Sequence, residues 1–287
     1  MKRIAVIGAG TMGHGIAQVA AMAGYETMLT DAREEALEVA IGRINQNLEG
    51  AVQRGKLSRE ELHAVRNRLG IDPELEHAVK RADLVVEAIV EDLEAKRSLF
   101  RTLDALVSPT AVLATNTSSL SVKAIAEACR FPARVVGMHF FNPVHIMKLV
   151  EIVVPAGTDP STVERVREVV AKMGKQPIVV RDSPGFASSR LGVVLGLEAM
   201  RMVEDGVASP EDIDRAMELG YGHPMGPLRV TDLVGLDVRL AIAEHLHREL
   251  GESQYRPPDI LRRKVAAGEL GKKTGKGFYE WRGDSDA

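Results

Sequence analysis

The sequence has a single cysteine, Cys129, among its 287 residues. One cysteine excludes an intrachain disulfide framework and fits a reducing compartment. There is no cysteine pair and no H-x-x-x-H spacing, so the sequence predicts no zinc or other metal site. We interpret Cys129 as a buried structural thiol, because no motif around it indicates a nucleophile.

Long apolar runs and a strong net charge are also missing. No uninterrupted apolar stretch reaches the ~20 residues that span a bilayer, and the apolar run near the N-terminus is short. The net charge of −3 gives no global attraction for nucleic acid or acidic membranes, so an anionic partner must be held by local basic groups. We therefore expect a cytoplasmic protein with neither a nucleic-acid nor a membrane partner; an organellar protein whose transit segment has been removed is the alternative.

Residues 1–183 alternate short apolar runs with helical patterns. Several runs are apolar throughout, as in strands that are buried on both faces of a parallel sheet. The alternation predicts a doubly wound α/β domain with a mostly parallel sheet. The predicted strands are "RIAVIGA", "ETMLTD", "ADLVVEAIV", "TAVLATN", "RVVGMHF", "KLVEIVVP" and "QPIVVRD".

Two stretches have helical periodicity only. Residues 32–72 are broken at "RGKLS" and contain a capping box that begins at Ser58, which predicts a helical-hairpin arm. The residues alone leave open whether this arm is merely solvated or binds a ligand. In residues 184–287 the strands have stopped, and Ser209 before Pro210 marks one helix start. This second stretch predicts a separate all-α C-terminal domain.

A glycine turn follows the first predicted strand and opens a helix. Gly8, Gly10 and Gly13 have the G-x-G-x-x-G spacing. The first allows a tight turn, the second lets the backbone approach a pyrophosphate, and the third lets the helix pack on the strand. The turn therefore predicts a Rossmann-like dinucleotide site that includes Thr11 and Met12. A glycine turn without a nucleotide is the alternative.

Asp31 ends the second predicted strand, where a carboxylate can accept hydrogen bonds from a ribose diol. Its charge would repel a 2′-phosphate, so the sequence predicts NAD rather than NADP as the cofactor. Arg33 lies close by and works against this preference.

The segment "GMHFFNPVHIMKLVE" contains two polar residues among apolar ones, His139 and Glu151. Burying either group unpaired is costly. His139 lies near the end of a predicted strand, where open α/β sheets bind ligands. Glu151 follows after the chain has turned and can reach the imidazole. The pair predicts a general base and its orienting carboxylate; a structural histidine is the alternative.

Polar residues also follow two other predicted strands. In "ATNTSSL", Ser118 is a candidate to hold a substrate oxygen, or the cluster caps the next helix. In "VVEAIVEDLEAK", Glu87, Glu91 and Lys96 are candidates for helix capping or for contact with the nicotinamide ribose. The residues alone leave both alternatives open.

Taken together, these motifs resemble the L-3-hydroxyacyl-CoA dehydrogenase family in its short bacterial 3-hydroxybutyryl-CoA form. The resemblance covers nearly the whole chain. It implies reversible NAD-dependent oxidation of the 3-hydroxyl of an acyl-CoA thioester by a homodimer that associates through its helical domain. The stretches that carry it are "GAGTMGHGIA", "DLVVEAIVEDLEAK", "ATNTSSLS", "GMHFFNPVHIMKLVEIV", "DSPGF", "GHPMGP" and "GKKTGKGFYEW".

The resemblance also implies roles for individual residues. His139 becomes the catalytic base and Glu151 its partner, while Ser118 binds the 3-oxygen of the substrate. The helical arm becomes the place where CoA is held. The remaining implied contacts are Asn142 beside the nicotinamide, Glu91, Lys96 and Lys273 at the cofactor, and Arg54 and Lys56 at the CoA phosphates.

One position departs from the family pattern. Ser189 in "GFASSRLG" stands where the family usually has an asparagine that assists substrate binding and catalysis. A serine hydroxyl is shorter than that amide, so we expect weaker turnover or a somewhat different substrate. Two other functions stay open: oxidation of a free hydroxy acid or sugar acid such as L-gulonate, and a catalytically silent, NAD-binding structural protein.

Overall fold

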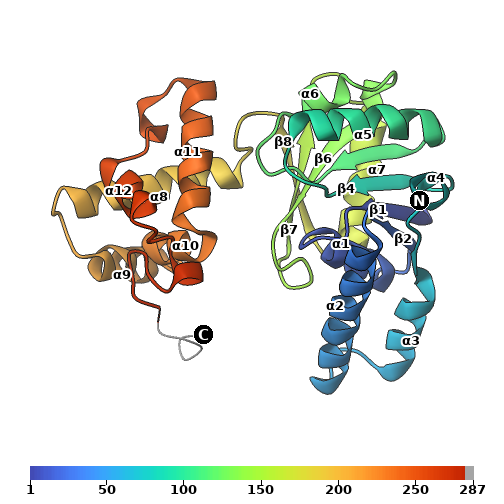
Figure 1. Ribbon diagram of the computed structural model, residues 1–287, viewed down its shortest axis with the longest axis horizontal. Helices are drawn as coiled ribbons and strands as arrows, with labels where there is room; N and C mark the ends of the chain where they lie inside the picture. The colour runs from blue at the N-terminus through green and yellow to red at the C-terminus, as the bar shows by residue number, and fades with distance from the viewer. Residues whose placement is uncertain (282–287) are drawn as a thin grey trace. The chain divides into compact units, whose positions relative to one another are not determined.

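The computed structural model describes residues 1–281 and divides the chain into two compact units, Met1–Ser183 and Pro184 onward (Figure 1). Of the described helices, none is both long enough and apolar enough to cross a membrane.

The first unit is built on one sheet with the strand order β3-β2-β1-β4-β5-β6-β7-β8. Neighbours from β3 to β6 pair in parallel, β6 and β7 pair antiparallel, and β7 and β8 are again parallel. This confirms the predicted mostly parallel α/β architecture. The strands are β1 Arg3–Ile7, β2 Glu26–Thr30, β3 Leu69–Ile71, β4 Leu84–Glu87, β5 Val112–Thr115, β6 Val135–Phe140, β7 Leu149–Val154 and β8 Gln176–Arg181.

Helices complete this unit by covering the apolar strands. Leu84 and Val86, which alternate along β4, share one core cluster with Ile16 of α1 and Val166 of α7. Val85 therefore points to the opposite face of the sheet. The helices are α1 Gly13–Met22, α2 Glu34–Gln53, α3 Arg59–Arg68, α4 Leu75–Val79, α5 Leu93–Leu106, α6 Val122–Ala126 and α7 Pro160–Lys172, with a short 3₁₀ turn at Pro132–Arg134.

Helices α2 and α3 form the predicted arm, which projects from the sheet in Figure 1. The capping box is present: Glu61 N donates to Ser58 Oγ (3.1 Å) and Ser58 N donates to Glu61 Oε2 (2.8 Å). The prediction of helix only over residues 32–72 was incomplete, because Leu69–Ile71 forms β3 beside β2. The arm is thus the crossover between β2 and β3.

The chain turns between β6 and β7 through a loop, residues 141–148. Its Val144 packs against α1, where a Cβ on Gly15 would come within 2.8 Å of the valine Cβ. Lys175 fixes the loop in place, because its buried ammonium donates hydrogen bonds to the carbonyl oxygens of Val144 (2.5 Å) and Met147 (2.8 Å).

Cys129 is buried, and its Sγ lies 3.7 Å from the Phe100 carbonyl oxygen. Burial, together with the charge of Asp104, raises the pKa of the thiol to about 11. A thiol that stays protonated in this way is a poor nucleophile at neutral pH, in agreement with the structural role predicted for it.

The regular elements of the second unit, within its described residues, are helices, and its C-terminal segment adds two isolated β-bridges, Gly271–Lys276 and Lys276–Glu280. The apolar stretch "GPLRVTDLVGLDVRLAIAEHLHREL", residues 226–250, has one helical period in the sequence but forms two helices, because Gly235 has φ +101° and separates α10 from α11. Gly196 lets α8 approach α10 closely, since a Cβ there would lie 3.0 Å from Thr231 Oγ1. The helices are α8 Ser188–Glu204, α9 Pro210–Tyr221, α10 Pro227–Val234, α11 Leu236–Leu250 and α12 Asp259–Ala266, with 3₁₀ turns at Ser253–Tyr255 and Lys272–Thr274.

The last described segment of the chain is tied to α10 through Asp232, whose side chain is buried. Its Oδ1 accepts a hydrogen bond from Phe278 N, and its Oδ2 accepts from Tyr279 N and Trp281 Nε1, all at 2.9 Å. A Cβ on Gly277 would overlap this carboxylate at 2.2 Å. The segment therefore closes around the aspartate, with glycine required at the point of closest approach.

Candidate active site

The glycine turn lies between β1 and α1 and has little spare room on its inner side. Gly8 has φ +97°, and a Cβ on it would come within 2.5 Å of the Ala88 carbonyl oxygen. A Cβ on Gly13 would overlap the Gly8 oxygen at 1.6 Å. By contrast, a Cβ on Gly10 would meet no described heavy atom within 4 Å. The middle glycine thus borders open space where a phosphate can approach the backbone.

Helix α1 begins at this open space. In the described chain its N-cap residue, Met12, makes no side-chain capping hydrogen bond. The N–H groups of a first helical turn attract an anion, and no acidic side chain competes for them in this turn. These features fit the pyrophosphate of a dinucleotide.

A cavity of about 880 Å³ adjoins the turn and is lined by Thr11, Asp31 and Arg33 among others. Asp31 Oδ2 accepts a hydrogen bond from Ala9 N (2.7 Å), and its Oδ1 accepts one from Arg33 N (3.0 Å). Each carboxylate oxygen can accept more than one hydrogen bond, so Asp31 remains able to bind a ribose diol. The Arg33 side chain is exposed, and its Nε lies 3.8 Å from Asp31 Oδ1.

A second cavity of about 360 Å³ shares Met12, Ala88 and Ile89 with the first. Polar residues from three neighbouring strand ends line it. They are Glu91 after β4, Asn116 and Ser118 after β5, and His139 and Asn142 at the end of β6. The structure therefore brings four sequence-predicted polar residues, Glu91, Ser118, His139 and Asn142, to one cavity.

His139 and Glu151 face each other across the β6–β7 ladder. The distance from His139 Nδ1 to Glu151 Oε2 is 2.8 Å, and the two residues are 7% and 0% exposed. A carboxylate oxygen at this distance favours the tautomer of a neutral imidazole that carries its proton on Nδ1, in which Nε2 is the acceptor nitrogen. The ring of Phe141 packs beside the imidazole, with 4.5 Å between the ring centroids.

A buried ionic network lies under this cavity. Lys96, 1% exposed, donates to Glu87 Oε1 (2.6 Å) and lies 3.4 Å from Glu91 Oε2. Glu87 also accepts hydrogen bonds from Thr115 Oγ1 (2.6 Å) and Ile89 N (2.7 Å). The Lys96 ammonium is therefore inside the protein, so any contribution it makes to cofactor binding passes through Glu91.

Glu91 connects this network to the residues after β5. Its Oε1 accepts hydrogen bonds from Thr117 Oγ1 (2.6 Å) and Ser118 N (2.9 Å). Burial alone would raise the pKa of Glu91, but these hydrogen bonds and the charge of Lys96 outweigh it and hold the pKa below its ordinary value. Glu91 is therefore an anion that fixes the backbone at Ser118.

Two residues of the site were not singled out from the sequence. Asn116 lines the cavity, and its Oδ1 accepts a hydrogen bond from Phe140 N (2.9 Å), which ties the end of β5 to the end of β6. Thr117 is buried beneath Ser118. Their only signal is their position in a polar segment that follows an apolar strand.

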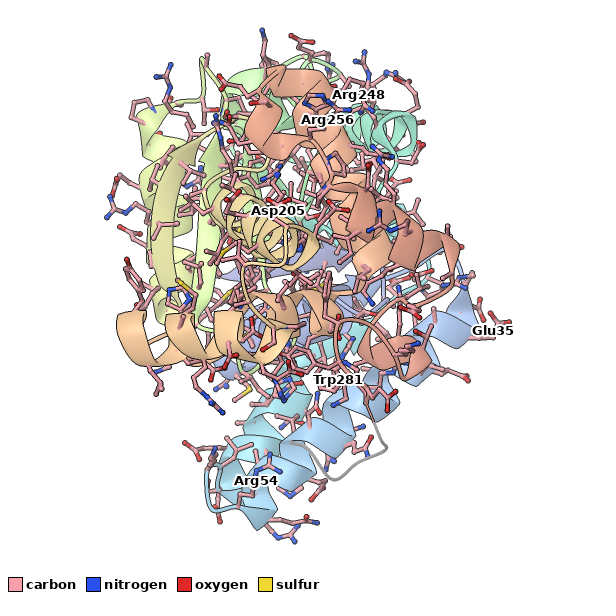
Figure 2. All side chains as sticks on the ribbon, turned by 90° about the vertical axis from the view of Figure 1, so that its left-hand side faces the viewer. Glu35, Arg54, Asp205, Arg248, Arg256 and Trp281 are labelled. Carbon is pink, nitrogen blue, oxygen red and sulfur yellow. The ribbon has the colours of Figure 1, made fainter. Side chains whose placement is uncertain are left out.

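The predicted CoA-binding cations lie on the arm. Arg54, labelled in Figure 2 near the end of the hairpin, folds back along α2, where its Nη1 would be 3.1 Å from a Cβ on Gly50. It lines a cavity of about 580 Å³ with Asn47 and other polar residues of α2. Lys56 is exposed in the hairpin turn and does not line this cavity.

The other two predicted residues belong to the second unit. Ser189 is in the first turn of α8. Lys273 is in the C-terminal 3₁₀ turn, where its Nζ is 2.5 Å and 2.7 Å from the two carboxylate oxygens of Asp237. Their roles stay predictions.

Comparison with known families matches both units of the chain. Residues 3–183 match the model described as 3-hydroxyacyl-CoA dehydrogenase, NAD binding domain, and residues 185–281 match 3-hydroxyacyl-CoA dehydrogenase, C-terminal domain. The matched NAD-binding domain identifies the cofactor as NAD, as the sequence predicts.

Individual relatives match over nearly their full length. A probable 3-hydroxybutyryl-CoA dehydrogenase of Bacillus subtilis is 47% identical over 281 residues, which is 98% of each chain. The crystal structure of FadB2 from Mycobacterium tuberculosis has a TM-score of 0.93 at 43% identity, covering 98% of this chain and 99% of that one. The structure of (S)-3-hydroxybutyryl-CoA dehydrogenase PaaH1 from Ralstonia eutropha has a TM-score of 0.95 at 36% identity, with the same coverage.

Proposed function

The chain belongs to the 3-hydroxyacyl-CoA dehydrogenase family, and we propose that its substrate is a short-chain (S)-3-hydroxyacyl-CoA, 3-hydroxybutyryl-CoA first. The proposal rests on the buried His139–Glu151 pair at a cavity that adjoins the glycine turn. The reaction is the reversible oxidation of the 3-hydroxyl group to a ketone. The relatives named above support the choice of substrate.

In this proposal His139 is the general base. Its Nε2 would remove the proton of the 3-hydroxyl group. NAD held at the glycine turn and Asp31 would supply the hydride acceptor for the carbon that bears this hydroxyl. Glu151 holds Nδ1–H and stabilises the positive charge that the imidazole gains. Proton transfer to a positioned base typically contributes ~10²–10⁴ in rate.

Ser118 and Asn142 would position the reacting groups. The Ser118 hydroxyl is proposed to donate to the 3-oxygen, and Asn142 is proposed to lie beside the nicotinamide. Support comes from their places in the same cavity as His139. Glu91 would keep Ser118 in place by accepting a hydrogen bond from its backbone N–H, and the ion pair with Lys96 would hold Glu91 itself.

The arm is proposed to hold the CoA part of the substrate. Arg54 borders a polar cavity on α2, and Lys56 adds an exposed cation at the nearby turn. Cations at these positions would attract the CoA phosphates although the chain as a whole is slightly acidic.

We further propose that the chain forms a homodimer through its helical unit. Large apolar side chains are exposed there, including Leu219 and Tyr221 of α9 at 80% and 79%. Covering such exposed apolar side chains with a partner lowers the free energy of the assembly. Light scattering coupled to gel filtration measures the mass of the assembly, and a monomer at micromolar concentration would contradict the proposal.

The function is tested by following NADH absorbance with acetoacetyl-CoA and with longer 3-ketoacyl-CoA thioesters. We expect the wild-type enzyme to reduce acetoacetyl-CoA and the His139→Ala variant to be slower by on the order of 10² or more. Both proteins should bind NAD equally. Faster oxidation of a free 3-hydroxy acid or of gulonate would favour the sugar-acid alternative. NADH binding without any turnover would favour the silent structural protein.

A further inference from the structure

We propose that the first unit has a second small-molecule site, at the end of the sheet opposite to the NAD cleft, which binds an organic anion with an apolar body. The site is a cavity of about 680 Å³, a size that is typical of small-molecule sites. It is lined by the first residues of three neighbouring strands: Arg3 of β1, Glu26 of β2 and Leu69 of β3.

This cavity is separate from the NAD cleft. The cleft is lined by the last residue of β1, Ile7, and by the end of β2, whereas the second cavity is lined by the first residue of β1, Arg3. At the ~3.3 Å rise per residue of a parallel strand, the length of β1 places the two cavities roughly 13 Å apart. One ligand that fills the cofactor cleft therefore leaves the second cavity free.

The floor of the cavity is apolar. Ile4, Ala78 and Ala82 are buried beneath it, and Met28 and Leu69 are partly exposed within it. Binding of an apolar group against this floor is favourable, because it removes apolar surface from water. A cavity with this floor favours a ligand with a hydrocarbon or aromatic part over a simple inorganic ion.

The rim of the cavity is basic. Arg3 is already paired with Glu26, with Nε and Oε2 2.7 Å apart. Arg68, Lys80 and Arg81 are exposed on the rim, and within residues 1–281 none of the three forms an ion pair.

These unpaired cations stand around one depression in a chain whose net charge is −3. Their mutual repulsion would be relieved by an anion, and the planar guanidinium groups suit a carboxylate, phosphate or sulfonate. The cationic rim and the apolar floor together select a small amphipathic anion. The head group would bind the rim and the apolar body would cover Met28 and Leu69.

The probe for this site is 1-anilinonaphthalene-8-sulfonate, which combines a sulfonate with an aromatic body and fluoresces when its surroundings become apolar. It is titrated into the full-length protein in the presence of saturating NAD⁺, so that the cofactor cleft is occupied. The neutral analogue N-phenyl-1-naphthylamine is titrated in parallel. We expect the sulfonate to bind at one saturable site, and we expect this binding to persist at saturating NAD⁺. The neutral analogue should bind to the same site more weakly.

The variants separate this site from other apolar surfaces. The double variant Arg68→Glu/Lys80→Glu should weaken sulfonate binding by about tenfold or more, because two charged contacts are lost. Arg68→Gln/Lys80→Gln should give an intermediate loss. Arg101→Glu is the matched control: Arg101 is exposed on α5, lies outside the cavity lining, and should leave binding unchanged.

A thermal melt of each variant shows whether it is folded. If the Arg68→Glu/Lys80→Glu variant does not fold, the Arg68→Gln/Lys80→Gln variant tests the proposal in its place. Displacement of all bound sulfonate by NAD⁺ would overturn the proposal, as would equal binding by the double variant and the wild type. Equal affinity for the neutral analogue would also overturn it. None of these measurements uses the dehydrogenase activity, so this site and the proposed function stand or fall separately.

Discussion

His139 of β6 and Glu151 of β7 are direct partners in an antiparallel ladder, with 2.8 Å between Nδ1 and Oε2. Their contact is therefore set by the register of two strands rather than by a flexible loop. A slip of one residue would turn one of the two side chains to the other face of the sheet. The pairing of β6 with β7 thus positions the proposed base before any ligand is present.

We expect Glu151→Gln to lower turnover by on the order of 10². The amide can still accept from Nδ1–H, but it cannot stabilise an imidazolium as an anion does. Because the two residues would act as one unit, adding Glu151→Gln to His139→Ala should cost little more. Steady-state kinetics of the single and double variants measure this. A single variant within twofold of wild-type turnover would remove Glu151 from the proposed mechanism.

Asp31→Ala should erode the preference for NAD over NADP, because the carboxylate that would repel a 2′-phosphate is lost. Arg33→Ala is the matched control, since it leaves the carboxylate and removes the cation beside it. The ratio of kcat/KM for the two cofactors measures the effect. An unchanged ratio in Asp31→Ala would mean that the ribose is recognised elsewhere.

Lys96→Met should lower the free energy of unfolding by about 3–5 kcal/mol, because it leaves the fully buried Glu87 carboxylate without its cation. Lys123→Met provides the comparison: Lys123 is exposed and lies 3.8 Å from Glu127, so its loss should cost no more than about 1 kcal/mol. Urea unfolding measures both. Equal stability of the two variants would show that the buried network contributes little.

Ser189→Asn should raise turnover on ordinary 3-hydroxyacyl-CoA substrates, because the longer amide restores a second hydrogen-bonding group at this position. Rates with several acyl chain lengths measure the effect. If activity is unchanged across the series, the departure from the family pattern has no catalytic consequence.

The pKa of Asp104 predicts one pH dependence of stability. Burial alone would raise this pKa, but hydrogen bonds from Arg134 (2.7 Å) and Arg130 (2.9 Å) outweigh it and hold the pKa below its ordinary value. A lowered carboxyl pKa stabilises the folded state above the pKa of the unfolded chain, and this contribution is lost as the pH falls through the folded pKa.

We therefore expect Asp104→Asn to be less stable than the wild type at neutral pH, with a gap that narrows progressively below pH ~4, the ordinary range of an aspartate. Thermal unfolding of both proteins between neutral and acidic pH measures the gap. A gap that is constant over the whole range would show that the carboxylate charge is not the cause.

The sequence predicts most of the first unit because buried parallel strands are apolar throughout and glycine turns have fixed spacing. It does not reveal β3, since three residues around Gly70 are too few to show a strand period. The break between α10 and α11 is hidden because Gly235 is also tolerated inside a helix.

Some residues of the candidate active site are also evident from the sequence, and others are not. His139, Glu151 and the glycine turn are evident from the sequence because polar or glycine residues interrupt apolar strands there. The sequence makes Lys96 a candidate for helix capping or cofactor contact, and only the fold shows that it lies between two carboxylates. Such long-range contacts have no local signal.

The Asp232 carboxylate closes the helical unit around the final described turn of the chain, so this unit is complete only once translation has passed Trp281. A nascent chain that lacks this tail would lose the three hydrogen bonds that Phe278, Tyr279 and Trp281 donate to the carboxylate. Shortened products of proteolysis or premature termination should consequently be less stable than the full chain, although every helix from α8 to α12 is present in them.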